Sequence, residues 1–212
     1  GGERIVYLPS PHNPSGSTIP LDEVEAIADA TAEETLVVVD EAYGEFAAVD
    51  SAIPLVDERD DVAVLRTFSK AYGLAGLRIG YSVVPEAWGE AYARVNTPFA
   101  ANELACRAAL AALDDDEHVE QSVETARWAR DYIARELDAP TVDSAGNFVL
   151  AAVGDGERVA EAAQERGVII RDCTSFGLPE HVRVSTGTRE ETREAVALLN
   201  ETLADLELGV RA

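Results

Sequence analysis

The sequence has almost no lysine. Lys70 is the only lysine among 17 basic residues, and all the others are arginines. Arginine serves well as a surface charge, but its guanidinium stays protonated and cannot attack a carbonyl group. A lysine amine can lose its proton and form a Schiff base. The retention of a single lysine therefore favours a chemical role for Lys70, and the alternative is a leftover surface lysine.

Methionine is absent altogether, even at position 1. A natural translation start needs methionine, and this chain opens on Gly1-Gly2-Glu3-Arg4 and runs straight into an apolar segment. We therefore expect either a processed chain or a fragment of a longer protein, and the missing start favours a fragment.

Other absences exclude whole classes of protein. No run of about 18 apolar residues is present, so the sequence predicts no membrane span and no secretion signal. Cys106 and Cys173 lie far apart in unlike surroundings, which favours reduced thiols in a cytoplasmic protein over a disulfide. The three histidines are scattered without metal-ligand spacing, and we predict no metal site.

The charge is strongly one-sided, with 40 acidic against 17 basic residues and a net charge of −23. Such a chain repels nucleic acid and has no basic patch to offset the repulsion. The acidic residues are spread along predicted helices, arginine replaces lysine, and Ala and Val replace larger apolar residues. Together these features indicate a halophilic protein adapted to a cytoplasm of molar salt, where charges are screened over a few ångströms.

The first half of the chain alternates short apolar runs with a helical segment. Helical spacing of apolar residues predicts a helix over 21–30, with Pro20 near its first turn. The apolar runs predict strands buried in a mostly parallel sheet, and the expected strands are 5–8, 36–39, 62–65 and 79–84. The fold class is therefore predicted to be α/β.

The second half predicts a smaller α+β domain. Its expected helices are 103–113, 119–137, 158–166 and 190–206, and its expected strands are 148–152, 168–170 and 182–185. We place the boundary so that residues 1–115 belong to a larger domain and residues 116–212 form the small C-terminal domain.

Polar residues follow three of the expected strands. Asn13, Asp40 and Lys70 each come after the carboxyl end of a strand, where ligands of open parallel sheets bind. A lysine imine, an acid for a ring nitrogen and an arginine for a phosphate are what pyridoxal phosphate needs from a protein. Asp40 suits the ring nitrogen, and the alternative is an ordinary aspartate in a turn, which would give the same sequence pattern.

Further residues near Asp40 and Lys70 complete this pattern. Tyr43 can reach the same cavity, and Arg78, eight residues after Lys70, can bind a phosphate bidentately. Thr67 and Ser69 add hydroxyl groups beside the lysine. Taken singly, each also suits a packing or turn role. Their order along the chain makes coincidence a poor explanation, and we predict a pyridoxal-phosphate site.

Four segments carry a resemblance to a known family: SPHNPSG at 10–16, VDEAY at 39–43, TFSKAYGLAGLR at 67–78 and RVSTGTREE at 183–191. With these segments the chain resembles the fold-type I, class I/II pyridoxal-phosphate aminotransferases, and within them the histidinol-phosphate aminotransferase branch. The resemblance implies a partial cofactor-binding large domain followed by a small α+β C-terminal domain. It also implies that an upstream part supplying further cofactor contacts is missing. His12 departs from the family pattern, and no role is assigned to it.

The resemblance also implies roles for individual residues. Lys70 is the expected catalytic residue, which binds the cofactor and moves the substrate proton. The expected cofactor-binding residues are Lys70 with Asp40 at the ring nitrogen, Asn13 and Tyr43 at the phenolic oxygen, and Thr67, Ser69 and Arg78 at the phosphate. The expected substrate-binding residues are Arg183 and Asn147.

The implied reaction converts L-histidinol phosphate and 2-oxoglutarate into imidazole-acetol phosphate and L-glutamate, in a cytoplasmic homodimer. One arginine, Arg183, can serve both anions because its planar fork accepts phosphate or carboxylate bidentately. Three alternatives remain open. They are a threonine-phosphate decarboxylase, which the segment RDCTSFG at 171–177 also resembles, another class I/II aminotransferase, and a catalytically incompetent fragment of such an enzyme.

Overall fold

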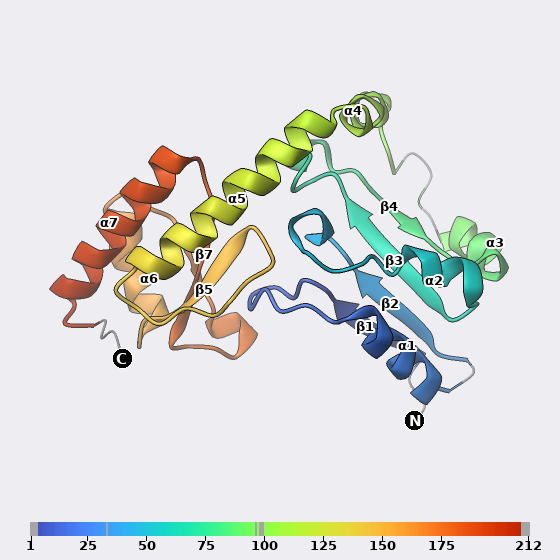
Figure 1. The fold of residues 1–212 in the computed structure, drawn as a ribbon, viewed down its shortest axis with the longest axis horizontal. Coiled ribbons are helices and arrows are strands. Elements are labelled where there is room, and N and C mark those ends of the chain that lie inside the picture. The colour runs from blue at the N-terminus through green and yellow to red at the C-terminus, as the bar shows by residue number, and fades with distance from the viewer. Residues whose placement is uncertain (1–3, 33, 96, 98–99, 209–212) are drawn as a thin grey trace. The chain divides into compact units, whose positions relative to one another are not determined.

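The computed structural model describes residues 4–32, 34–95, 97 and 100–208. The chain forms two compact units, shown in Figure 1. The first consists of residues 1–11 and 18–120, and the second of residues 12–17 and 121–212. The short segment 12–17 therefore groups with the C-terminal residues, although it directly follows the first strand.

The first unit is built on a four-stranded sheet. The strands are β1 (Ile5–Pro9), β2 (Leu36–Asp40), β3 (Val62–Thr67) and β4 (Gly80–Val83). They are arranged in the order β1-β2-β3-β4, with the first three parallel and β4 antiparallel to β3. The predicted mostly parallel sheet is confirmed, and each strand falls within two residues of its expected bounds.

Two helices cover one face of this sheet. In α1 (Leu21–Ala30), Val24 and Ala28 lie four residues apart and are both buried, so this helix packs with one apolar stripe. The second helix is α2 (Ile53–Glu58), which the sequence analysis did not anticipate. Together they bury the valines that alternate along β2 and β3, namely Val37, Val39, Val62 and Val64.

The first strand is not buried as predicted. Val6 and Leu8 pack against the core under α1 and α2, but Ile5 is 61% exposed and Tyr7 54% exposed. Side chains alternate between the two faces of a strand, and β1 pairs only with β2 at the edge of the sheet. Every second residue of β1 therefore points to the face that α1 and α2 do not cover.

The first unit also contains α3 (Glu86–Val95), α4 (Glu103–Leu113) and the start of α5 (Asp116–Glu136). Helix α4 has the bounds predicted from the sequence, and Asn102 caps it by accepting a hydrogen bond from the Ala105 amide at 2.9 Å. Helix α3 was not predicted. Within the described residues, no helix combines the length and apolar character needed to cross a membrane.

The second unit packs helices on a small antiparallel sheet. Its strands are β5 (Phe148–Ala152), β7 (His181–Ser185) and β6 (Arg171–Asp172), in the order β5-β7-β6. The rest of α5, α6 (Gly156–Glu165) and α7 (Arg189–Asp205) contribute to its core with residues such as Ile133, Val159 and Leu199. Helix α7 starts with a capping box between Thr188 and Glu191.

The strand predicted over 168–170 is wrong. These residues have no regular structure, and pairing with β7 begins only at Arg171. Gly167, in the left-handed region at φ +92°, leads out of α6 into this segment. Ile169 is 83% exposed there, so the apolar run that suggested a strand is not buried in the sheet.

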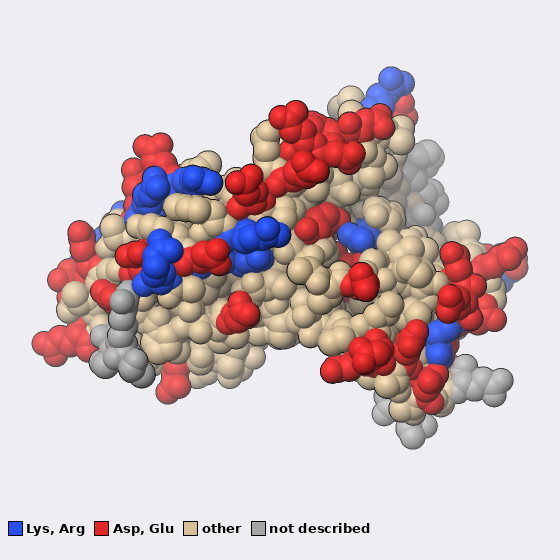
Figure 2. All heavy atoms as spheres, in the orientation of Figure 1, with Lys and Arg blue, Asp and Glu red and all other residues tan. Residues whose placement is uncertain are grey.

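Acidic side chains are scattered over the visible surface of both units, and basic side chains are fewer (Figure 2). This distribution agrees with the sequence, in which acidic residues occur along most helices.

Candidate active site

Lys70 lies in a tight turn directly after β3. The turn is closed by hydrogen bonds from the Gly73 amide to the Lys70 carbonyl and from the Leu74 amide to the Phe68 carbonyl, both 2.9 Å. Gly73 adopts φ +70°, which favours glycine. The lysine Nζ lies 5.3 Å from the centroid of the Tyr43 ring, so the fold brings these two predicted site residues together.

Asp40 is the last residue of β2, the strand that pairs with β3. Its Oδ1 accepts a hydrogen bond from the Ala42 amide at 2.9 Å, and its Oδ2 accepts one from the Tyr7 hydroxyl. Asp40 stands opposite Leu65 in the β2–β3 register, two residues before β3 ends at Thr67. The carboxyl ends of these parallel strands therefore present Asp40 and the lysine turn at the same edge of the sheet.

Two hydroxyl groups and one guanidinium belong to the lysine turn. Thr67 Oγ1 donates to Ser69 Oγ at 2.9 Å and accepts from the Ser69 amide at 3.1 Å. Arg78 is exposed, has a left-handed backbone at φ +53°, and uses Nη1 to bind the Ala75 carbonyl at 2.8 Å. Arginine carries five N–H donors, so Arg78 keeps donors for an anion.

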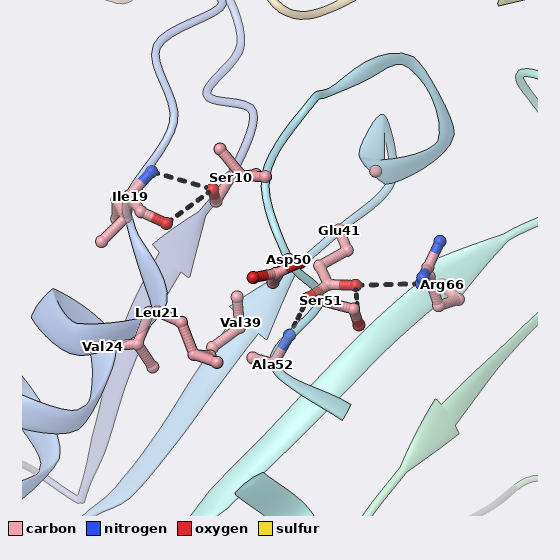
Figure 3. A pocket seen from close by; sticks show the side chains of 12 residues that line it. Ser10, Ile19, Leu21, Val24, Val39, Glu41, Asp50, Ser51, Ala52 and Arg66 are labelled. Atoms are coloured by element: carbon pink, nitrogen blue, oxygen red, sulfur yellow. Dashed lines mark hydrogen bonds and ion pairs between the residues drawn. The ribbon is translucent and has the colours of Figure 1, made fainter. Parts of the chain in front are cut away.

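A buried charged cluster underlies the segment after Asp40, and sequence reasoning missed it. Arg66 on β3 pairs with Glu41 through Nε at 3.0 Å and with Glu45 through Nη1 at 2.7 Å. Glu41 also accepts from the Ser51 hydroxyl at 2.7 Å and from the Ala52 amide at 2.6 Å (Figure 3). These contacts fix the backbone on both sides of Tyr43.

The Glu45 carboxyl has a raised pKa, because burial outweighs the opposing effect of Arg66. Beside Glu41 and Arg66 lies a cavity of about 50 Å³, with Ser10 and Val39 in its wall (Figure 3). Such a cavity has room for a few water molecules and is too small for a cofactor. The candidate site is therefore at the strand ends and not in this cavity.

In the second unit, Arg183 on β7 is held from two sides. Its Nη1 donates to Asn13 Oδ1 at 2.6 Å, and its guanidinium carbon lies 5.3 Å from the centroid of the Phe148 ring. Asn147 directly precedes Phe148, and its carbonyl accepts from the Thr186 amide at 2.9 Å. The structure thus joins Asn13 to Arg183 directly and anchors the backbone of Asn147 to the end of β7.

Backbone contacts hold the 12–17 segment in the second unit. The Ala145 amide donates to the Gly16 carbonyl at 2.9 Å, and Gly16 packs so closely that a Cβ there would lie 2.7 Å from Ser144 Cα. Arg130 on α5 donates to the Gly146 carbonyl at 2.6 Å. His12 forms a 2.8 Å hydrogen bond to Ser15 within the segment. The bonds of His12 and Gly16 flank Asn13 in the chain.

Arg171 is a further candidate that sequence reasoning did not select. It stands directly opposite Arg183 in the β6–β7 register, so both arginines lie on the same face of the small sheet. Its Nη2 donates to Ser175 Oγ at 3.1 Å. The sequence does place an arginine directly after the apolar run 168–170. We expected the strand to end before that arginine, so Arg171 was not predicted to face Arg183.

Comparison with known proteins identifies relatives of the whole chain. Residues 1–199 match the family described as aminotransferase class I and II. The chain is 91% identical over 212 residues to the histidinol-phosphate aminotransferase of Halorubrum lacusprofundi, covering all of this chain and 58% of that protein. It is 68% identical over 205 residues to that of Haloarcula marismortui, covering 97% of this chain and 57% of that protein.

A solved structure has a similar fold. The histidinol-phosphate aminotransferase of Sinorhizobium meliloti, in complex with pyridoxal-5'-phosphate, matches with a TM-score of 0.87 and 34% identity, covering 96% of this chain and 58% of that one. The chain spans somewhat more than half the length of these relatives. Because the family match extends over nearly its full length, the chain belongs to the class I and II aminotransferases.

Proposed function

We propose that this chain is part of a pyridoxal-phosphate-dependent aminotransferase that converts L-histidinol phosphate and 2-oxoglutarate into imidazole-acetol phosphate and L-glutamate. One observation carries the proposal: a relative of that activity is 91% identical over the whole chain. The side chains at the strand ends support it, because the only lysine lies beside Tyr43 and follows the strand next to the one that Asp40 ends.

The residues of the first unit fit pyridoxal phosphate. They offer an amine for its aldehyde at Lys70, a carboxylate for its ring nitrogen at Asp40, and hydroxyl and guanidinium donors for its phosphate at Thr67, Ser69 and Arg78. When bound, the cofactor supplies an aldehyde and a ring that withdraws electrons from the substrate's α-carbon. Lys70 would then take the proton from that carbon of the amino donor, and in the second half-reaction it would deliver a proton to the corresponding carbon of the 2-oxo acid.

The remaining residues orient cofactor and substrate. We assign Tyr43 and Asn13 to the phenolic oxygen of the ring, and Arg183 and Asn147 to the substrate. The hydrogen bond from Arg183 Nη1 to Asn13 Oδ1 leaves the Asn13 amide nitrogen free to donate. It also leaves other guanidinium N–H groups for the phosphate of histidinol phosphate or a carboxylate of glutamate. Arg171, on the same face, is placed to add positive charge beside them.

Covalent labelling tests the cofactor assignment. Borohydride reduction of the full-length protein in the presence of pyridoxal phosphate should attach the cofactor to Lys70. Lys70→Arg should abolish the label, because a guanidinium does not add to an aldehyde. Arg107→Lys, which places a new amine on the exposed side of α4, is the matched control and should remain unlabelled there. A label confined to the terminal amine would refute the role of Lys70.

Product analysis tests the reaction. With L-histidinol phosphate and 2-oxoglutarate, the full-length protein should release L-glutamate. Release of carbon dioxide from threonine phosphate in place of transamination would favour the decarboxylase alternative. Turnover by the full-length protein but not by residues 1–212 alone would favour the incompetent-fragment alternative.

We also propose that the protein acts as a cytoplasmic homodimer, in which residues 1–115 complete the cofactor domain and residues 116–212 form the small domain. These assignments rest on the family resemblance and on the enzyme class. Sedimentation of the full-length protein in molar potassium chloride, with a mass of two subunits, is the expected result.

A further inference from the structure

Tyr7 contacts Asp40 across two neighbouring strands. In the β1–β2 register Pro9 stands opposite Asp40, and Tyr7 precedes Pro9 by two residues, so Tyr7 and Asp40 lie on the same face of the sheet. Neighbouring strands lie about 4.8 Å apart and two residues span about 6.6 Å along a strand, so such diagonal neighbours are about 8 Å apart, within reach of a tyrosine side chain. The Tyr7 hydroxyl uses this geometry to donate a hydrogen bond to Asp40 Oδ2.

The Asp40 carboxylate is thereby held by one donor on each oxygen, the Ala42 amide on Oδ1 and the Tyr7 hydroxyl on Oδ2. An ionised carboxylate has about four lone-pair sites, so each oxygen keeps one free. Rotation of the carboxyl group would break at least one of the two bonds. The free lone pairs therefore have a fixed direction.

We propose that Tyr7 is a positioning residue for Asp40, which orients the carboxylate so that a free lone pair meets the ring nitrogen of pyridoxal phosphate. This inference rests on the proposed function, since it assigns Asp40 to that nitrogen. Tyr7 acts through Asp40, and no contact with cofactor or substrate is assigned to it.

The Tyr7 hydroxyl meets Asp40 outside the core under α1 and α2, because the side chain lies on the opposite face of the sheet. Partial burial, the hydrogen bond to Asp40 and the Asp40 charge, in that order, raise the pKa of Tyr7 to about 12. Tyr7 thus stays a neutral donor throughout the range in which enzymes work.

The pairing is tested without cofactor. Carbon-13 labelling of the tyrosine Cζ atoms in the full-length protein, in molar potassium chloride, gives a resonance for Tyr7 that the Tyr7→Phe variant identifies. We expect this resonance to titrate near pH 12, and Asp40→Asn to lower its midpoint without restoring the ordinary value, because burial remains. Asp40→Asn should also move the resonance at about pH 8. If the chemical shift of the Tyr7 resonance is the same in the wild type and in Asp40→Asn at every pH, the pairing is overturned.

Cofactor titration then tests positioning. Tyr7→Phe should weaken the binding of pyridoxal phosphate about tenfold, the scale of one hydrogen bond to a charged group. Tyr92→Phe, at an exposed tyrosine on α3, is the control and should bind like the wild type. Equal affinity in Tyr7→Phe and wild type overturns the positioning role and leaves the proposed function standing. Wild-type protein that fails to bind the cofactor refutes the proposed function. The carbon-13 titration still shows in that case whether Tyr7 is hydrogen-bonded to Asp40.

Discussion

At the scale of single residues, the polar groups of the candidate site are held by several partners each. Arg183 lies between Phe148 and Asn13, and Asp40 is bound by Tyr7 and the Ala42 amide. Partly buried polar groups are costly unless they are hydrogen-bonded, so the fold supplies partners. The same contacts restrict each group to one orientation, which a binding site requires.

Arg183→Lys in the full-length enzyme should weaken both histidinol phosphate and glutamate. Lysine keeps the charge but loses the bidentate fork, so we expect a loss of about 1–3 kcal/mol for each anion. Borohydride labelling of Lys70 should be unchanged. Arg193→Lys, on α7 beside Trp128, is the control and should leave the Michaelis constants unaltered. A lower melting temperature with normal Michaelis constants in Arg183→Lys would show a purely structural arginine.

Glu45 should make stability depend on pH. Its pKa is raised in the folded state, so the folded chain holds this proton more tightly than the unfolded chain. The contribution to stability is therefore present below the ordinary carboxyl pKa and is lost as the pH rises through the folded value. Glu45→Gln removes this dependence, and its unfolding free energy relative to wild type should increase between about pH 4 and about pH 7.

Denaturant unfolding in molar potassium chloride at both pH values measures this difference. Glu90→Gln on α3 is the matched control, because Glu90 is 82% exposed in its pair with Arg94. The account of Glu45 fails if the two glutamine variants show the same pH dependence.

At the scale of elements, the 12–17 segment is held within the second unit. It follows β1 in the chain, but Gly16 and Asn13 contact residues of the second unit. A turn that follows a strand of one unit and packs against another part of the chain has a restricted conformation. The close packing of Gly16 is the feature most sensitive to substitution.

Gly16→Ala should destabilise the fold by roughly 2 kcal/mol or more. The residue has φ +77°, and a Cβ would lie 2.0 Å from Ser144 Oγ and 2.7 Å from Ser144 Cα, so strain and overlap add. Gly89→Ala in α3 is the control. No atom lies within 4 Å of its Cβ, and alanine should stabilise the helix by about 0.5–1 kcal/mol. Thermal or denaturant unfolding compares them, and equal stability of Gly16→Ala and wild type would contradict the packing seen here.

At the scale of the whole molecule, the main feature is the net charge of −23. Ion pairs such as Arg94–Glu90 and Arg107–Glu103 join exposed side chains, and exposed pairs contribute little to stability. Acidic side chains cover more of the surface seen in Figure 2 than basic side chains do. The source of the close relatives, Halorubrum and Haloarcula, agrees with a protein that folds in concentrated salt.

The melting temperature should rise steeply between low and molar potassium chloride. Self-repulsion among 40 acidic residues opposes compaction until counterions screen it, at a Debye length of about 3 Å in 1 M salt. Circular dichroism melts across this range test the prediction. Sucrose, which favours the compact state without screening charge, is the control and should not reproduce the whole effect. A melting temperature that does not change with salt would refute the halophilic interpretation.

Much of the secondary structure could be predicted from the sequence. The bounds of α1, α4 and β5 agree with the prediction, because apolar periodicity and caps such as Asn102 act within one or two turns of chain. The wrong predictions also arise because these signals are local and do not report which segments the sheet buries. The run 168–170 has strand character but lies outside the sheet, and Ile5 and Tyr7 are exposed because β1 is an edge strand.

The sequence by itself determined which residues can do the chemistry: one lysine, an acid and an arginine, each after a strand. Only the tertiary structure decided how they are held. Asn13 and Arg183 are 170 positions apart, and their contact depends on the docking of segment 12–17. The contact of Tyr7 with Asp40 depends on the β1–β2 register. Local propensity acts over neighbouring residues, whereas register and packing are set by the whole chain at once.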